Sequence, residues 1–220
     1  MEVLLLSLVS AFFVGLSNVL SRKGLDSGTR TQAILVSLVS SALALWLATL
    51  LLADIRSILV PAAFLFVFVG ILGPGIGRTF TITSLKRIGV SRTIPIIGTA
   101  PFFATIVAIL FLGEGYSFYI FVGTVLIVFG IYILTRRSKP NGKKFDKKDL
   151  FLPLGAAAFG GCSMALSKKA LLVLEEPIAG AALAVTAGLF VVLVYIILTG
   201  RIQQLQSSRD TIQFLSLIHI

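Results

Sequence analysis

The chain has 220 residues, of which 57% are hydrophobic and only 13% are charged, and its mean hydropathy is +1.03. Soluble domains carry about a quarter charged residues, so this composition excludes an ordinary soluble protein. The formal net charge of +10 comes from basic residues in short loops between apolar runs, which indicates membrane topology and no nucleic-acid partner.

Apolar runs of about 20 residues recur along the chain, and each is long enough to cross a bilayer core of about 30 Å. Backbone groups in lipid must be satisfied within their own segment, so these runs are expected to be helices. The first run lacks the basic leader and cleavage site of a secretory signal and is expected to be a retained span. Spans are predicted at 3–21, 33–53, 58–85, 93–112, 117–135, 150–167 and 178–199, with an eighth that begins near 211.

The distribution of basic residues predicts the orientation of the chain. The linker "RRSKPNGKKFDKK" occupies residues 136–148 between the fifth and sixth spans. Fifteen of the 19 Lys and Arg residues fall on the side of this linker and three fall on the other. The positive-inside rule therefore predicts a cytoplasmic linker and an N-terminus outside.

An internal repeat relates the two ends of the chain. Residues 4–25 align with residues 150–171 without a gap, and half of the aligned positions are identical. The identical pairs include Gly15 and Gly161, Ser17 and Ser163, and Lys23 and Lys169. Each copy would contain five spans, an odd number, so the second copy would enter the membrane inverted, as in many secondary transporters.

This repeat predicts three parts: a first five-helix repeat at 1–135, a basic linker at 136–149 and an incomplete second repeat at 150–220. A complete second copy would extend beyond residue 220, so the chain is expected to be a fragment. The tail "SLIHI" resembles the translated edge of a sequencing adapter, which leaves open whether it is native.

Four features in sequence order carry a family resemblance. They are "SLKRIGVSR" (84–92), Pro101 within the fourth span, "FLGE" (111–114) and "VGTVLIVFGIYIL" (122–134). Together they resemble the EamA-type domain of the drug/metabolite transporter superfamily. The resemblance implies ten helices in two inverted five-helix units around a central cavity that passes small metabolites or drugs. It also implies two cytoplasmic termini, whereas the charge distribution of this chain predicts the N-terminus outside.

Arg78 is the only charged residue inside a predicted span. It lies eight residues before Lys86, about 12 Å deeper than the expected membrane interface. Charges at such depth usually face a cavity or a partner, so Arg78 is a candidate anion or carboxylate site on a substrate path. The alternative is that its long side chain snorkels toward the headgroups.

The stretch "GPGIG" before Arg78 contains Gly73, Pro74, Gly75 and Gly77, which weaken the helix. Pro74 removes a backbone donor and is a candidate hinge. Local unwinding would offer backbone groups to a ligand, which makes Gly75 a candidate substrate-binding residue. The alternative is a close helix contact through Gly73 and Gly77.

Other polar residues and prolines interrupt the spans. Thr79 in the third span, and Ser17 and Asn18 in the first, are candidate substrate-binding residues, although hydroxyls in spans most often bond to backbone or to a neighbouring helix. Pro95 and Pro101 bend the fourth span and are candidate hinges for alternating access, with static kinks as the alternative.

The sequence offers little for catalysis. Cys162 and His219 are the only residues of their kinds, so no catalytic residue, metal site or cofactor is expected. Glu114 would be attractive as a coupling carboxylate, but its glycine neighbours favour a loop role. The protein is therefore expected to be no enzyme.

The function predicted is a secondary transporter that moves small metabolites or drugs by alternating access across the plasma membrane of a prokaryote. The alternatives are a flippase for lipid-linked cargo and a non-transporting membrane assembly factor. The expected partners are a small-molecule substrate and the lipid bilayer, with a homodimer left open. Substrate identity, direction and coupling ion do not follow from the sequence.

Overall fold

The computed structural model describes residues 2–27, 29–53, 63–113, 115, 118–137, 146–174 and 176–200. All regular structure within these residues is helical, so the predicted all-α class is confirmed. The α-helices are α1 (Glu2–Ser27), α2 (Arg30–Leu52), α3 (Ala63–Gly70), α4 (Arg78–Ile88), α5 (Val90–Ile97), α6 (Ala100–Leu112), α7 (Phe118–Arg137), α8 (Phe151–Leu171) and α9 (Pro177–Leu198). Two further segments are the π-helical η2 (Ile71–Gly77) and the 3₁₀-helical η3 (Lys147–Leu150).

Five helical segments in the described part of the chain are long and apolar enough to cross a membrane. They are Thr31–Leu52, Ala63–Ile88, Val90–Leu112, Lys148–Leu171 and Pro177–Leu198. These segments correspond to the second, third, fourth, sixth and seventh spans expected from the sequence. Helices α1 and α7 lie at the positions of the first and fifth, the eighth lies outside the described residues, and the total of seven or more spans stays a prediction.

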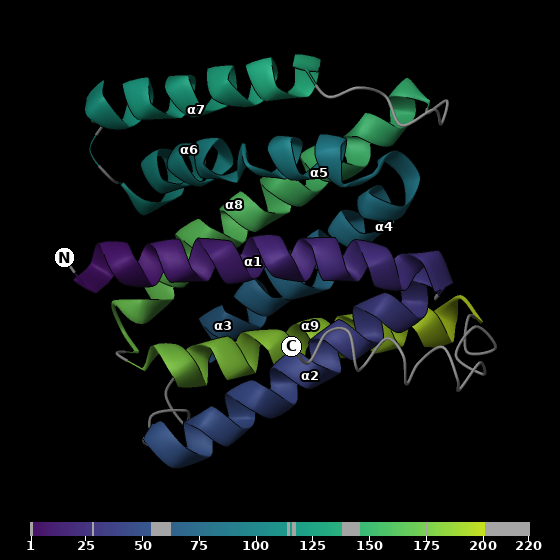
Figure 1. The fold of residues 1–220 in the computed structure, drawn as a ribbon. Coiled ribbons are helices and arrows are strands. Elements are labelled where there is room, and N and C mark those ends of the chain that lie inside the picture. The colour runs from purple at the N-terminus through teal and green to yellow at the C-terminus, as the bar shows by residue number, and fades with distance from the viewer. Residues whose placement is uncertain are drawn as a thin grey trace.

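Local sequence signals fix several helix ends. Helix α2 begins at a capping box, in which the Gln32 N–H donates to Thr29 Oγ1 at 3.2 Å and the Thr29 N–H donates to Gln32 Oε1 at 2.8 Å. Helices α4 and α6 are followed by Gly89 (φ +83°) and Gly113 (φ +67°), a backbone region that favours glycine. One residue joins α4 to α5 and five residues join α6 to α7, and the two helices of each pair run in opposite directions (Figure 1).

The third span lies at the centre of the bundle (Figure 1). Its segments α3 and η2 contact both α8 and α9, and α4 contacts α8 and α2, while α2 packs along α9 and α6 packs along α8. Helix α7 lies at one edge, next to α5 and α6. The α2–α9 contact includes a hydrogen bond from Trp46 Nε1 to Thr186 Oγ1 at 2.9 Å.

Glycines allow this central span to approach its neighbours at backbone distance. A Cβ placed on Gly188 of α9 would lie 2.6 Å from Pro74 Cβ and 2.8 Å from Gly75 N. A Cβ on Gly70 of α3 would collide with the carbonyl oxygen of Ala184 on α9. Gly161 serves the contact between α8 and the fourth span in the same way, because a Cβ there would collide with the carbonyl oxygen of Ala100. Lipid tails supply no hydrophobic drive between spans, so close packing of small residues is a main source of their association.

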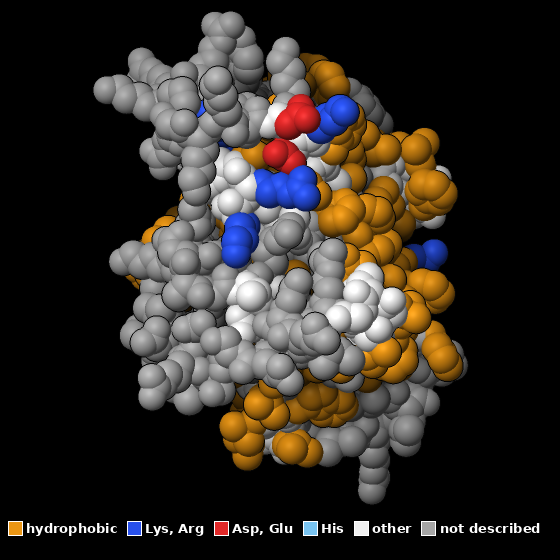
Figure 2. Space-filling view, turned by 90° about the vertical axis from the view of Figure 1, so that its right-hand side faces the viewer, with side chains coloured by type: hydrophobic (Ala, Val, Ile, Leu, Met, Phe, Trp, Pro, Cys, Tyr) orange, Lys and Arg blue, Asp and Glu red, His pale blue; other side chains and the backbone are white. Residues whose placement is uncertain are grey.

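The outer surface is apolar along the helices and carries charged side chains near their ends. Leu51, Phe129 and Leu198 are each more than half exposed, as expected for side chains that face lipid. Figure 2 views the right-hand end of Figure 1, where basic and acidic side chains gather beside a hydrophobic flank. There the Arg87 Nη1 lies 2.6 Å from Asp149 Oδ1, which joins the end of α4 to η3.

The substitution Gly188→Val should destabilise the bundle because its side chain would enter the contact between α9 and η2. Overpacking of this kind costs about 1–3 kcal/mol, which corresponds to a melting temperature lower by roughly 2–12 °C in a chain of this size. Thermal unfolding in detergent measures the shift. Gly130→Val on α7 is the control, because a Cβ at Gly130 meets no atom within 4 Å. Equal melting temperatures for the two variants would contradict the packing role of Gly188.

Candidate functional site

A cavity of about 520 Å³ lies at the centre of the bundle, where α1, α2, α8 and α9 meet the third and fourth spans. The described polar side chains that line it are Ser17, Ser37, Ser41, Arg78, Thr81 and Ser163. Apolar side chains, including Leu38, Ile97 and Met164, form much of the remaining wall. The volume lies within the range of about 300–1,000 Å³ that is typical of small-molecule sites.

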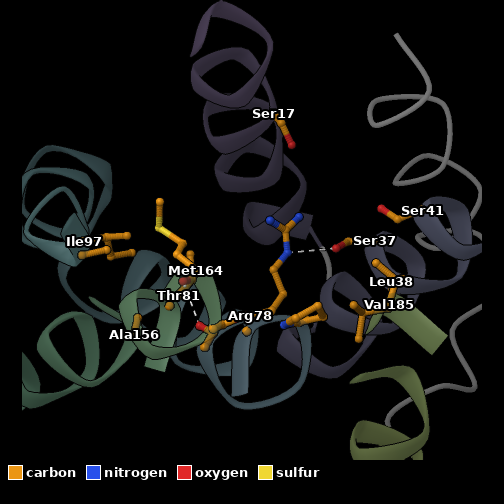
Figure 3. Close-up of a pocket in the computed structure, with 16 residues that line it drawn as sticks. Ser17, Ser37, Leu38, Ser41, Arg78, Thr81, Ile97, Ala156, Met164 and Val185 are labelled. Carbon is orange, nitrogen blue, oxygen red and sulfur yellow. Dashed lines mark hydrogen bonds between the residues drawn. The ribbon is translucent and has the colours of Figure 1, made fainter. Parts of the chain in front are cut away.

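Arg78 enters this cavity from the first residue of α4 (Figure 3). Its Nε donates to Ser37 Oγ on α2 at 3.0 Å, and its guanidinium points toward Ser17 on α1. Within the described residues, no carboxylate lies at ion-pair distance from Arg78 and no acidic side chain lines the cavity. Because a guanidinium stays protonated, the cavity carries one permanent positive charge.

Arg78, Ser37 and Ser17 lie on three different helices at similar depths in the bundle. Arg78 lies ten residues before α4 ends at Ile88, and Ser37 lies seven residues after α2 begins at Arg30. Ser17 lies ten residues before α1 ends. These three helix ends lie on the same side of the bundle (Figure 1). At a rise of 1.5 Å per residue, all three side chains lie roughly 10–15 Å inside that end.

The direction of the Arg78 side chain bears on the snorkelling alternative. Side chains on a helix lean toward its N-terminus, and the N-terminus of α4 is its deeper end. The contact with Ser37 holds the guanidinium inside the bundle, away from the helix end that carries Lys86 and Arg87. This is the geometry of a cavity-lining side chain, whereas snorkelling would turn it toward Lys86.

The stretch before Arg78 stays helical, but over Ile71–Gly77 it is a π-helix, in which each N–H pairs with the carbonyl five residues earlier instead of four. Pro74 has no N–H, so in π-helical pairing the carbonyl five residues earlier, at Val69, loses its donor. Ser163 on α8 supplies a replacement, because its Oγ donates to the Val69 oxygen at 3.0 Å in a buried position. Gly73 makes room for this hydroxyl, since a Cβ there would lie 2.5 Å from Ser163 Oγ.

The structure brings only two of the five candidate substrate-binding residues to the central cavity. The central cavity brings together Arg78 and Ser17. Thr79 lines a second cavity of about 240 Å³ between α2, α4, α8 and α9, and its Oγ1 donates to the Gly75 oxygen at 2.7 Å. Gly75 packs against α9, and Asn18 is not among the described residues that line the central cavity.

The candidate hinges all lie beside the central cavity. Pro74 lines it directly. Pro95 lies within α5 and Pro101 in the first turn of α6, and the turn at Gly98–Thr99 breaks the fourth span between them. Ile97 and Ala100 on either side of this break line the cavity. Glu114 lies outside the described residues.

The cavity also contains polar residues besides the candidates Arg78 and Ser17. Ser37 and Ser41 are four residues apart on α2, a spacing that places two hydroxyls on one helix face. Thr81 lies three residues after Arg78 and shares its face for the same reason. Ser163 was detectable through its partner in the internal repeat, which already was a candidate. In the part of the chain that the structure describes, no cluster of His, Cys, Asp or Glu could hold a metal ion.

Ser163→Ala should destabilise the protein because it leaves the Val69 carbonyl buried without a donor. The expected cost is about 1–3 kcal/mol, or a melting temperature lower by roughly 2–12 °C in detergent. Ser167→Ala, one turn later on α8 and outside the described cavity lining, is the matched control. A variant at position 163 that melts together with the control would show that the Val69 carbonyl needs no partner.

Comparison with known proteins agrees with this architecture. The model of the EamA-like transporter family matches residues 1–136. No curated protein and no solved structure gives a significant match. The matched region contains Arg78 with the Ser17 and Ser37 side chains around it, and it includes three of the five helical segments long enough to cross a membrane. The chain is a multi-pass membrane protein and belongs to the EamA-like transporter family.

Proposed function

We propose that the protein is a secondary transporter that moves small metabolites or drugs through the central cavity by alternating access. The observation that carries this proposal is the Arg78 guanidinium, which faces a cavity of about 520 Å³ and lies roughly 10–15 Å from the charged end of the bundle. A cation at such depth is costly, and in membrane proteins it usually marks a substrate or ion pathway. Membership in a family of transporters supports such a role for Arg78.

The surroundings of the cavity support movement around a fixed site. Its wall combines helices of the first repeat with α8 and α9, which the sequence assigns to a second, inverted repeat. Transporters built from inverted repeats commonly bind substrate at the repeat interface and rock one unit against the other. The π-helical turn at Pro74 and the break at Gly98–Thr99 are two irregular positions at which such a rotation would be absorbed.

The same proposal places the protein in the plasma membrane of a prokaryote with its N-terminus outside. The Arg87–Asp149 ion pair supports the charge count, because it brings the basic end of α4 next to the end of the basic linker. Lys168 and Lys169, which the count assigns to the other side, lie at the far end of α8 from this ion pair.

Transport by reconstituted protein tests the function. Liposomes that contain the protein are exposed to labelled amino acids, sugars and small organic acids, and at least one solute should equilibrate faster than in empty liposomes. Arg78→Gln should reduce that rate at least about tenfold, because one charge-assisted contact is worth about 1.5–3 kcal/mol. Arg87→Gln, which removes an arginine outside the described lining of the central cavity, should keep most of the activity.

Two outcomes would reject this proposal. Absence of protein-dependent movement for every solute would favour a non-transporting assembly factor. Protein-dependent movement of a fluorescent lipid phosphate between leaflets, without solute movement, would establish the flippase alternative instead.

Cysteine labelling tests the orientation. In a Cys162→Ser background, Glu2→Cys should react with a membrane-impermeant maleimide in intact cells, whereas Lys144→Cys in the linker should react only after lysis. The positive-inside rule predicts this pattern, because the linker carries the largest group of basic residues. The reverse pattern would place the N-terminus inside.

A further inference from the structure

We infer that the central cavity selects small monocarboxylates that carry an apolar group. The inference rests on the proposed transport function and specifies its substrate class. It is built from three properties of the described lining: its single charge, the free edge of the guanidinium, and the apolar side chains opposite.

The charge of the cavity sets the charge of the ligand. Arg78 is the only charged side chain in the described lining, and in the described chain it has no ion-pair partner. A ligand with one negative charge neutralises the guanidinium. A second negative charge would lack a partner, and an amine would bring a second positive charge into a site of low polarity, where unpaired charges are strongly disfavoured.

The hydrogen bond to Ser37 sets which part of the guanidinium is available. Because Nε donates to Ser37 Oγ, the plane of the fork is fixed against α2. The two Nη atoms point toward Ser17, across the cavity (Figure 3), and make no hydrogen bond to another described residue. Parallel N–H donors of this kind match the two oxygens of a carboxylate.

The apolar side chains of the cavity wall determine which uncharged group the ligand carries. Ile97 and Met164 lie on one side of Arg78 in Figure 3, and Leu38 and Val185 lie on the other. Of the five hydroxyl side chains in the described lining, those of Ser37, Thr81 and Ser163 already take part in hydrogen bonds. A sugar would therefore have fewer partners than hydroxyls, whereas an aliphatic or aromatic group would bury apolar surface. The volume of about 520 Å³ is ample for an acid of about ten non-hydrogen atoms.

Binding to the purified chain in detergent tests the inference with four related probes. They are phenylacetate, its neutral amide phenylacetamide, the amine phenethylamine and the dianion phenylmalonate. Phenylacetate should raise the melting temperature in a saturable way, and the other three should bind at least about tenfold more weakly, since each lacks or exceeds the single negative charge. Equal stabilisation by phenylacetate and phenylacetamide would overturn the inference.

Variants locate the effect. Arg78→Gln should weaken phenylacetate binding at least about tenfold. Ser37→Ala keeps the charge but releases Nε, so it should weaken binding about fivefold and serves if the first variant does not fold. Arg87→Gln is the matched control and should bind phenylacetate as the original chain does. Retained binding in Arg78→Gln, or loss in Arg87→Gln, would place the anion elsewhere and reject the cavity.

Binding and transport separate the two proposals. If phenylacetate binds through Arg78 but no solute crosses liposomes, the anion site stands and the transport function fails. If a neutral or cationic solute crosses in an Arg78-dependent way and phenylacetate does not bind, transport stands and the monocarboxylate class fails.

Discussion

The close approach of the third span to α8 and α9 is the constraint on which the cavity depends. In lipid the association of helices relies on packing and hydrogen bonds, because apolar side chains gain little by leaving the hydrocarbon. Gly188 leaves room for η2 against α9, and Gly73 leaves room for Ser163 of α8 against η2. With the backbones in contact at η2, the residue that follows, Arg78, begins α4 at the edge of the gap left between α1, α2 and α8.

The backbone N–H that Pro74 lacks determines how η2 is hydrogen-bonded to α8. Pro74 leaves the Val69 carbonyl without its helical donor, and a buried acceptor without a partner costs about 1–3 kcal/mol. The Ser163 hydroxyl meets this need from another helix. The irregular turn is therefore tied to α8 at the same level as the cavity, so a change in the η2 turn and a shift of α8 are mechanically coupled.

Hydropathy predicted the positions of the helices well, because burial in lipid requires long apolar runs. The spans expected at 33–53 and 178–199 differ from α2 and α9 by a few residues at most. Arg78 was found from its depth alone. The sequence does not distinguish the threonines that follow Arg78, and the structure places Thr81 at the central cavity and Thr79 at the second one. The bond of Ser163 to Val69 depends on a tertiary contact that no local pattern contains. The inverted repeat and the number of spans remain predictions.

The hydrogen bond between Trp46 and Thr186 makes the intrinsic fluorescence of the protein a probe of the contact between α2 and α9. Trp46 is the only tryptophan in the chain, so the near-ultraviolet emission of the protein arises chiefly from one indole at the junction of α2 and α9. The α2 helix also carries Ser37, which orients the guanidinium in the cavity. Separation of α2 from α9 would break the indole hydrogen bond and change the polarity around the ring. The emission wavelength of Trp46 and its quenching would then report the separation of α2 from α9 in real time, without any attached dye.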